Sequence, residues 1–493
     1  ASAEEASRAF QRAECLLIDH DLSPVSVHLY KLFSTWGAIA FETQEIDLME
    51  RLNDSLLRFG EERGDNLLIG TALGNASDAY RANGQFKKGL DCVNRALDVL
   101  DEKKHLTEVI ENLVRKGIFH YVVNEVSLAE ETFQDALALG MDRDESPEVF
   151  NALANAHAQM GFSNLLNVRP SRGLKHAKLT LDYAKNGNHP HRQLMAHVLI
   201  SLSRFYFGEY EKGRLVSEDG FFLVQRIYAY RLKGYLHISR ALIELAQGNI
   251  SKALEHISKA VQIGKTFSYY DVQAIGYRIR GDIYCLLQAY SSASKEYKAG
   301  YNIAREHFLG FDNCIRLGLA LALMGEMKSG CNLIEDAMGR LKVTTVKTGV
   351  ILALMAKQEV ARLEEDLECT KRLNLESQKL LENSDCLPYL LSNKILLGKI
   401  KFQEGDWDQA ESCFCDVSKR SSAMMNPWIE LESQLCWEKC LKAMEKDSTT
   451  QEKRIIQLLD HIRSGIKEDP YIKHYQNFRQ LVLAREAKPI LYF

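Results

Sequence analysis

Hydrophobic residues recur along most of this chain at the three- and four-residue spacing that places them on one face of an α-helix. In the segment HVLISLSRFYF (197–207), for example, Leu199, Leu202 and Phe205 follow this spacing. Leu, Ala, Glu and Lys dominate the composition, and only 8 of the 493 residues are proline, which favours long uninterrupted helices. The pattern predicts an all-α fold.

Short polar turns with a common spacing end many of these helices and begin the next ones. A glycine that opens such a turn supplies the left-handed conformation in which helices commonly end. The best copies are GQFKKGLD (84–91), GEYEKGRL (208–215), GNISKALE (248–255), GEMKSGCN (325–332) and GDWDQAES (405–412), and weaker copies are NEVSLAEE (124–131) and QAYSSASK (288–295).

Small residues flank each turn at fixed distances. They lie seven residues before the turn and five and twelve residues after it, and an apolar residue lies two after it. Around Gly248 these positions hold Ala241, Ile250, Ala253 and Ala260. Small side chains at such positions let two helices cross closely, so the pattern predicts repeated helix–turn–helix units.

The repeat period is read from the small residue five after each turn. Successive intervals between these residues are 40, 44, 40, 40, 40, 37 and 80. The interval of 80 spans two periods and predicts a degenerate repeat at roughly 346–383, and the 44 predicts an inserted loop, FSNLLNVRPS (162–171). The residues are Gly89, Ala129, Gly173, Gly213, Ala253, Ala293, Gly330 and Ala410.

This pattern resembles the tetratricopeptide (TPR) family, whose standard period is about 34 residues, with units lengthened to about 40. Long repeats of this kind are similar to the sensor arms of signal-transduction ATPases with numerous domains, including maltose-activator-like regulators and proteins associated with class III adenylate cyclases. The resemblance implies an α-solenoid of TPR-like repeats forming a right-handed superhelix, in which each repeat touches only its neighbours.

The resemblance also suggests a domain division. The repeat array is expected at 65–425, an N-terminal helical cap or linker to an upstream module at 1–64, and C-terminal helical repeats or a cap at 426–493. The first residue is alanine, which is compatible with processing and equally with a segment excised from a longer chain.

Charge and cysteine content narrow the class of protein. A net charge of −4 and a pI of 6.4 give no overall field that would attract nucleic acid or an anionic membrane. Eleven cysteines without an even framework indicate reduced thiols and a cytoplasmic location. No stretch approaches 18 apolar residues, so we expect no membrane insertion, and the opening residues lack the features of a signal peptide.

Three patterns were weighed as chemical sites. GEYEKGRL approaches a phosphate loop, but Arg214 and Leu215 replace the Lys and Ser or Thr, and the preceding segment is helical. Two groups could hold a metal, although their spacing fits ordinary loop and core positions better. They are His176, His189, His191 and His197, and Cys413, Cys415, Cys436 and Cys440. With no catalytic motif found, we predict no enzyme activity, cofactor or metal, and keep an enzyme with a site at the inserted loop as the least favoured hypothesis.

The remaining candidate is the inner groove of the superhelix, lined by the first helix of each repeat. Aromatic residues beside arginines are the types that dominate binding interfaces. We therefore predict a non-catalytic scaffold that binds a protein or peptide, with a small-molecule effector as an open alternative. It would be the sensor part of a larger signalling protein or a free-standing adaptor. The groove residues are His191, Phe205, Arg231, Tyr235, Asp271, Arg278, Asp282, Phe308 and Asp312.

Overall fold

The computed structural model describes residues 8–9, 11–12, 35–37, 39–123, 125–141, 146–305, 307–344 and 346–489. These residues are almost entirely helical, and no β-strand occurs among them. None of the helices in the described ranges is both long and apolar enough to cross a membrane.

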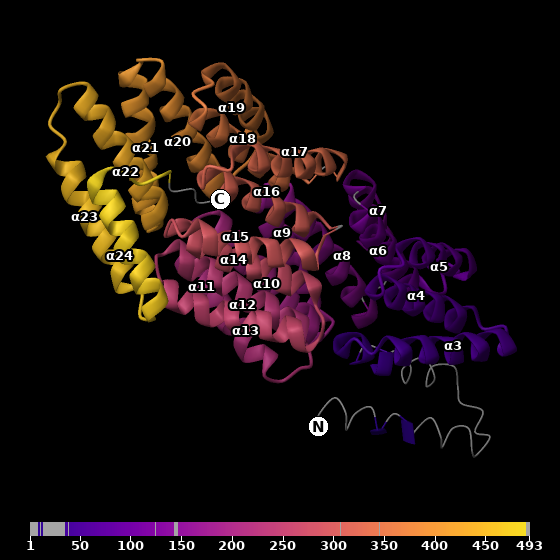
Figure 1. Cartoon of the computed structure of the whole chain (residues 1–493). Helices are drawn as coiled ribbons and strands as arrows, with labels where there is room; N and C mark the ends of the chain where they lie inside the picture. Colours follow the sequence, from indigo (N-terminus) through magenta and orange to yellow (C-terminus); the bar gives the residue numbers. More distant parts are fainter. Residues whose placement is uncertain are drawn as a thin grey trace. The chain divides into compact units, whose positions relative to one another are not determined.

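Helices follow one another along the chain with short turns between them (Figure 1). In the N-terminal part they are α3 (Ile46–Arg63), α4 (Asn66–Ala82), α5 (Phe86–Val99), α6 (Leu106–Val122), α7 (Val126–Met141), α8 (Pro147–Leu166), α9 (Pro170–Asn186) and α10 (Pro190–Tyr206). The middle holds α11 (Tyr210–Val224), α12 (Tyr230–Ala246), α13 (Ile250–Thr266), α14 (Tyr270–Leu286), α15 (Tyr290–Ile303), α16 (Phe308–Leu323) and α17 (Met327–Thr344). The rest are α18 (Lys347–Leu363), α19 (Leu367–Leu381), α20 (Leu387–Gln403), α21 (Trp407–Met424), α22 (Pro427–Ala443), α23 (Thr449–Ser464) and α24 (Asp469–Ala484).

The chain divides into two compact units. Unit 1 comprises 1–163, 175–197 and 221–232, and unit 2 comprises 164–174, 198–220 and 233–493. The two units alternate along the chain between residues 164 and 232, where short segments of unit 2 and unit 1 follow one another. The three-part division predicted from the sequence, with boundaries at 64/65 and 425/426, stays a prediction.

Alternate helices of unit 2 pack on one another and form a layer. From α13 to α24 each helix contacts the next one along the chain, and α14, α16, α18, α20 and α22 also contact each other in order. Helices that touch every second neighbour lie on the inner side of a curved stack, so this layer is called the inner layer. These contacts are those of an α-solenoid, which confirms the predicted fold class.

The turns that join paired helices keep the predicted left-handed geometry. Gly208, Gly248, Gly325 and Gly405 have φ of 72°, 80°, 98° and 79°. In the degenerate repeat, Glu365 adopts φ 60° at the same position, 40 residues after Gly325 and 40 before Gly405. The helices α18 and α19 flank it, so the repeat expected at roughly 346–383 is confirmed. A glutamate holds the turn there, which explains why the glycine pattern disappears.

Small residues at the helix crossings are packed as predicted. Ala253 and Ala293 are fully buried. A Cβ added to Gly213 would lie 2.8 Å from the Ile243 Cδ1 atom and 3.2 Å from the Ser201 carbonyl oxygen. The two glycines of GEYEKGRL therefore serve a turn and a helix crossing, and Arg214 forms ion pairs along its own helix.

The loop predicted at 162–171 is wrong. Helix α8 continues to Leu166, and α9 begins at Pro170 after a left-handed turn at Val168, whose φ is 54°. With 20 residues, α8 is three residues longer than the 17-residue α10. The extra residues of this repeat are therefore absorbed by about one more turn of helix.

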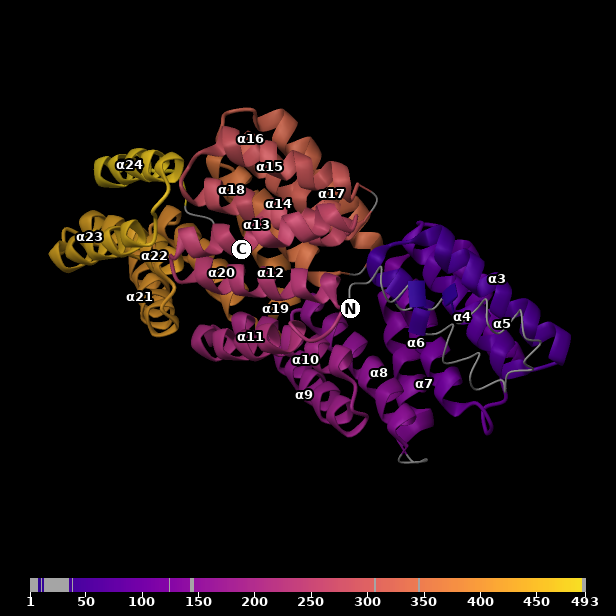
Figure 2. The ribbon, with the colours of Figure 1, turned by 90° about the horizontal axis from the view of Figure 1, so that it is seen from below.

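Distant repeats of unit 2 contact each other directly, so the expectation that each repeat touches only its neighbours is wrong here. The Asn426 side chain donates a hydrogen bond to the Tyr210 hydroxyl (2.9 Å), and the Trp428 indole donates to the Leu245 carbonyl (2.8 Å). The Ser251 backbone N–H donates to the Gly465 carbonyl (2.9 Å). Figures 1 and 2 show α22 to α24 alongside α11 to α14. The solenoid thus returns on itself after about 215 residues, as the separation of 216 between Tyr210 and Asn426 shows.

Candidate partner-binding site

The predicted groove residues are divided between the units. His191 and Arg231 belong to unit 1, and the other seven belong to unit 2. Within unit 2 the structure brings three of them, Arg278, Asp282 and Asp312, into one network on the inner helices α14 and α16. The binding role of all nine residues stays a prediction.

The first network links α14 to α16 through ion pairs. The Arg278 guanidinium donates to the Asp312 carboxylate at 3.3 Å, and the Arg316 guanidinium donates to the Asp282 carboxylate at 2.9 Å. The hydroxyl of Tyr297, which comes from α15, also donates to Asp282 at 2.8 Å. Sequence reasoning missed Arg316 and Tyr297, although Arg316 lies one helical turn after Asp312 on the same face.

The charges of this network are half-buried. The side chains of Arg278 and Asp312 are 20% and 17% exposed, and that of Arg316 is 6% exposed. Burial lowers the pKa of Arg316, but the carboxylates of Asp282 and Asp312 outweigh it and raise that pKa. The guanidinium therefore stays charged, and Arg278 presents the more accessible half of the network to solvent.

A second network continues the same layer across α18, α20 and α22. The Lys399 ammonium lies 2.7 Å from the carboxylates of both Glu359 and Glu432, and the Arg362 guanidinium donates to Glu359 at 2.7 Å. Burial raises the pKa of Glu359, but Lys399 and Arg362 outweigh it and lower that pKa to about 2. Five successive inner helices, α14 to α22, therefore carry paired charges.

A sequence signal for the second network exists, but it needs the turn positions. Asp282, Glu359 and Lys399 all lie six residues before a turn residue, namely Gln288, Glu365 and Gly405. The turn at Glu365 carries no glycine, and the register of the degenerate repeat could not be fixed from the sequence. The two network residues of the degenerate repeat, Glu359 and Arg362, were therefore not recognised as inner positions.

The other predicted residues take part in local packing. The Tyr235 hydroxyl donates to the buried Asp271 carboxylate at 2.7 Å. Phe205 is buried against Tyr206 and Tyr210, with ring centroids 5.2 and 5.9 Å apart. The remaining contacts are those of Phe308 with the ring of His307, at 4.2 Å between centroids, and of His191 with Glu42, at 3.2 Å between Nε2 and Oε1. Arg231 is half-buried.

Of the four histidines considered as metal ligands, His189 and His191 stay close, with ring centroids 6.3 Å apart. His176 pairs with His157, a residue that the sequence did not single out, with their Nδ1 atoms 3.0 Å apart. The same pair recurs 80 residues later, where the Nδ1 atoms of His237 and His256 lie 2.9 Å apart. Among the residues that the structure describes, no group of three or more His, Cys, Asp or Glu side chains could hold a metal ion.

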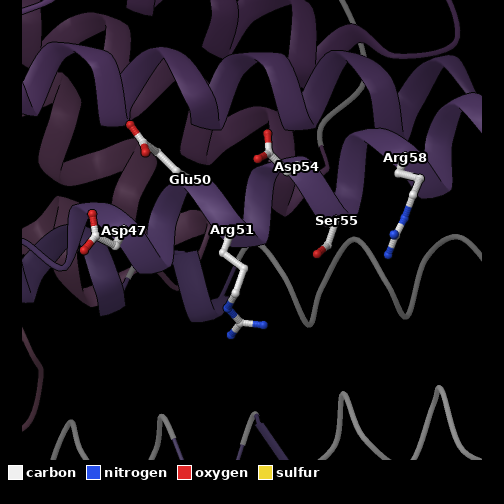
Figure 3. Close-up of a pocket in the computed structure, with 6 residues that line it drawn as sticks. All are labelled: Asp47, Glu50, Arg51, Asp54, Ser55 and Arg58. Carbon is white, nitrogen blue, oxygen red and sulfur yellow. The ribbon is translucent and has the colours of Figure 1, made fainter.

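A surface hollow of about 470 Å³ lies elsewhere, on α3 (Figure 3). The described residues that line it come from one face of this helix, at spacings of three and four residues, and none of them is a predicted groove residue. They are Asp47, Glu50, Arg51, Asp54, Ser55 and Arg58. The described part of its lining carries charges of both signs.

Comparison with known proteins supports the fold and goes no further. A scan against protein-family models finds no match, and neither does a search of curated proteins. Among solved structures, a chain of the APC/C hetero-tetramer Cut9–Hcn1 is similar, with a TM-score of 0.51 and 13% identity over 96% of this chain and 88% of that one. At this identity the similarity shows the fold alone, a TPR-like α-solenoid.

Two further solved structures show weaker similarity. Yeast Tom70 has a TM-score of 0.35 and 12% identity over 94% of this chain and 97% of that one. A Rap protein complexed with Competence and Sporulation Factor has a TM-score of 0.42 and 10% identity over 82% of this chain and 100% of that one.

Proposed function

We propose that this chain is a non-catalytic scaffold that binds a protein or peptide partner along the inner layer of unit 2. The observation that carries the proposal is the line of ion pairs on α14, α16, α18, α20 and α22, which are half-buried around Arg278 and Asp312 and buried around Glu359 and Glu432. Taking charges out of water is costly, and well-packed apolar residues in the same places are often at least as stabilising. The stack itself is held by small and apolar residues at its crossings, so the charges point to recognition.

The chemistry of the layer suits a polar partner segment. The Arg278 side chain is 20% exposed while its carboxylate partner holds it in place, and this suits a pre-organised hot-spot arginine. Alternating positive and negative groups along successive helices would select a partner of complementary charge pattern. The Cut9–Hcn1 hetero-tetramer is an example of a similar fold within a protein assembly.

The wider context of the scaffold belongs to the same proposal. The resemblance of the repeats to long-repeat sensor arms favours the regulatory part of a larger, cytoplasmic signalling protein. A free-standing adaptor is the alternative, and a small-molecule effector is a second kind of ligand for the same layer. An enzyme at the 162–171 segment loses its basis, because most of that segment lies in α8 and α9.

Peptide selection followed by titration tests the proposal. The full chain is used to select binders from a displayed library of random peptides, and isothermal titration calorimetry measures the affinity of each selected peptide. The variant Arg278→Leu/Asp312→Leu removes one inner ion pair as a unit, so that neither charge of that pair remains alone. We expect it to weaken binding by about tenfold or more, the effect of losing a hot-spot side chain.

A matched control removes an ion pair from the outer helix α13. Lys259 and Glu255 lie 2.7 Å apart and are exposed, so Lys259→Leu/Glu255→Leu makes the same chemical change away from the inner layer. We expect this control to bind the peptides like the unmodified chain. Equal affinities for both double variants, or a library that yields no binder, would contradict the proposal.

A further inference from the structure

The segment that follows α24 lies against the turn between α14 and α15 and is bound there like a peptide. The Gln288 side-chain amide donates to the Lys488 carbonyl at 2.6 Å, and the Lys488 backbone N–H donates to the Gln288 Oε1 atom at 3.1 Å. The Gln288 side chain thus forms hydrogen bonds with both backbone polar groups of Lys488, the N–H and the carbonyl, in a non-helical segment. Because both bonds are made with backbone groups, this contact recognises the main chain of the segment and does not depend on its side chains.

The conformation of Gln288 indicates that its side chain has a purpose. Its φ is 56°, a left-handed value that costs non-glycine residues roughly 1 kcal/mol or more. Four equivalent turns, at Gly208, Gly248, Gly325 and Gly405, avoid this cost with glycine, whereas the turn at Glu365 shares it. A glutamine here gives up backbone stability and gains a bidentate contact with Lys488.

The Lys488 ammonium lies between the C-terminal end of α16 and the Tyr290 ring, where a cation is favoured. It donates to the Leu323 carbonyl at the C-terminal end of α16, where helix carbonyls are left unpaired and the helix dipole is negative. It also lies 5.8 Å from the centre of the Tyr290 ring, within the range of a cation–π contact. The buried Tyr290 hydroxyl has no hydrogen-bond partner among the residues that the structure describes.

We propose that Gln288, Tyr290 and the C-terminal end of α16 form a binding site for an extended, lysine-bearing peptide segment. In this structure the chain's own Lys488 occupies it. A partner with the same chemistry competes with this tail, and Lys488 stays exposed, so another segment can reach the site. Because the tail is tethered, it acts at an effective concentration on the order of millimolar, and weak partners are excluded until the tail is displaced.

The site shares no residue with the ion pair of Arg278 and Asp312, so it can be tested separately from that pair. The probe is a fluorescein-labelled peptide with the sequence of residues 484–489, AREAKP, and its binding to the full chain is followed by fluorescence anisotropy. Lys488→Ala weakens the internal competitor, and we expect this variant to bind the probe about tenfold more tightly than the unmodified chain. A probe with norleucine in place of lysine keeps the length and loses the charge, and it should bind about tenfold more weakly.

Substitution of Gln288 tests the site without disturbing the turn. Gln288→Gly removes the side chain and places at this turn the residue that equivalent turns carry. Added to Lys488→Ala, it should abolish probe binding, whereas Glu365→Gly makes a comparable change at another turn with φ 60° and should leave binding intact. Arg278→Leu/Asp312→Leu in the same background should also leave it intact, which separates this site from the binding role proposed for that ion pair.

Three results would overturn the proposal. The first is that the probe does not bind Lys488→Ala at about 5 mM, which is near the effective concentration of a tethered segment. The second is that Lys488→Ala binds the probe equally well with and without Gln288→Gly. The third is that the norleucine probe and the lysine probe bind with equal affinity. Hydrogen exchange in the otherwise unmodified chain gives a further check. The Lys488 amide should exchange faster in Gln288→Gly, and an unchanged rate would also overturn the proposal.

Discussion

A close helix crossing in unit 2 predicts opposite effects for one substitution at two positions of the same helix. In α17, a Cβ added to Gly330 would lie 2.4 Å from the Gly318 carbonyl oxygen and 2.9 Å from the Ala322 backbone nitrogen, both in α16. Ordinary contacts begin near 3.4 Å, so Gly330→Ala must push α16 and α17 apart by about 1 Å. A Cβ added to Gly339 meets nothing within 4 Å.

The expected magnitudes follow from these distances. Alanine gains about 0.5–1 kcal/mol over glycine inside a helix, which is all that Gly339→Ala should show. Overpacking against backbone atoms costs about 1–3 kcal/mol or more, because backbone cannot rotate away as a side chain can. Gly330→Ala should therefore destabilise the crossing by about 1–2 kcal/mol net, and the two variants should differ by about 1.5–3 kcal/mol.

Native-state hydrogen exchange of α16 and α17 measures this difference locally, which matters because a repeat array need not unfold in one step. We expect faster exchange in both helices for Gly330→Ala and slower exchange for Gly339→Ala. Equal protection in the two variants, or greater protection in Gly330→Ala, would refute the explanation of the small residues as crossing points.

Two further predictions concern the charged interior. Arg316→Ala leaves the half-buried carboxylates of Asp282 and Asp312 short of a partner, and it should destabilise the chain by about 3–5 kcal/mol in thermal denaturation; a loss below about 1 kcal/mol would contradict the network. Burial, and then the neighbouring histidine, lower the pKa of His157 to about 4 and of His237 to about 3, so the unfolded chain binds more protons below pH 6.5. Stability should therefore fall as pH drops from 6.5 toward 4, and His157→Gln/His237→Gln should flatten urea midpoints over that range; an unchanged slope would contradict the neutral pairs.

The repeat was predictable from the sequence because its key positions are limited by the backbone. A left-handed turn favours glycine, and a close crossing excludes large side chains, so Gly248 and Ala253 keep these features whatever the helices bind. The exceptions have the same physical origin. Glu365 and Gln288 adopt left-handed turns without glycine. The Gln288 turn was recognised as the weaker copy QAYSSASK (288–295), and the repeat that holds Glu365 was located only by its distance from neighbouring turns.

The candidate site was only partly predictable. Arg278, Asp282 and Asp312 were identified from the inner stripe of each repeat, but their pairing depends on how α14 and α16 are offset, which the sequence of one repeat does not determine. Contacts across 200 residues, such as that of Gln288 with Lys488, depend on the curvature of the whole stack. Small rotations between successive repeats add up to that curvature, and no local pattern records them.

The central claim is that a protein or peptide partner binds along the inner layer of unit 2. Its most direct test is hydrogen exchange of the full chain with and without the tightest peptide from the display selection. We predict slower exchange in the inner helices α14, α16 and α18, and unchanged exchange in α13, α15 and α17, which lie outside that layer. Protection confined to α13, α15 and α17, or the absence of protection in the inner layer, would contradict the claim.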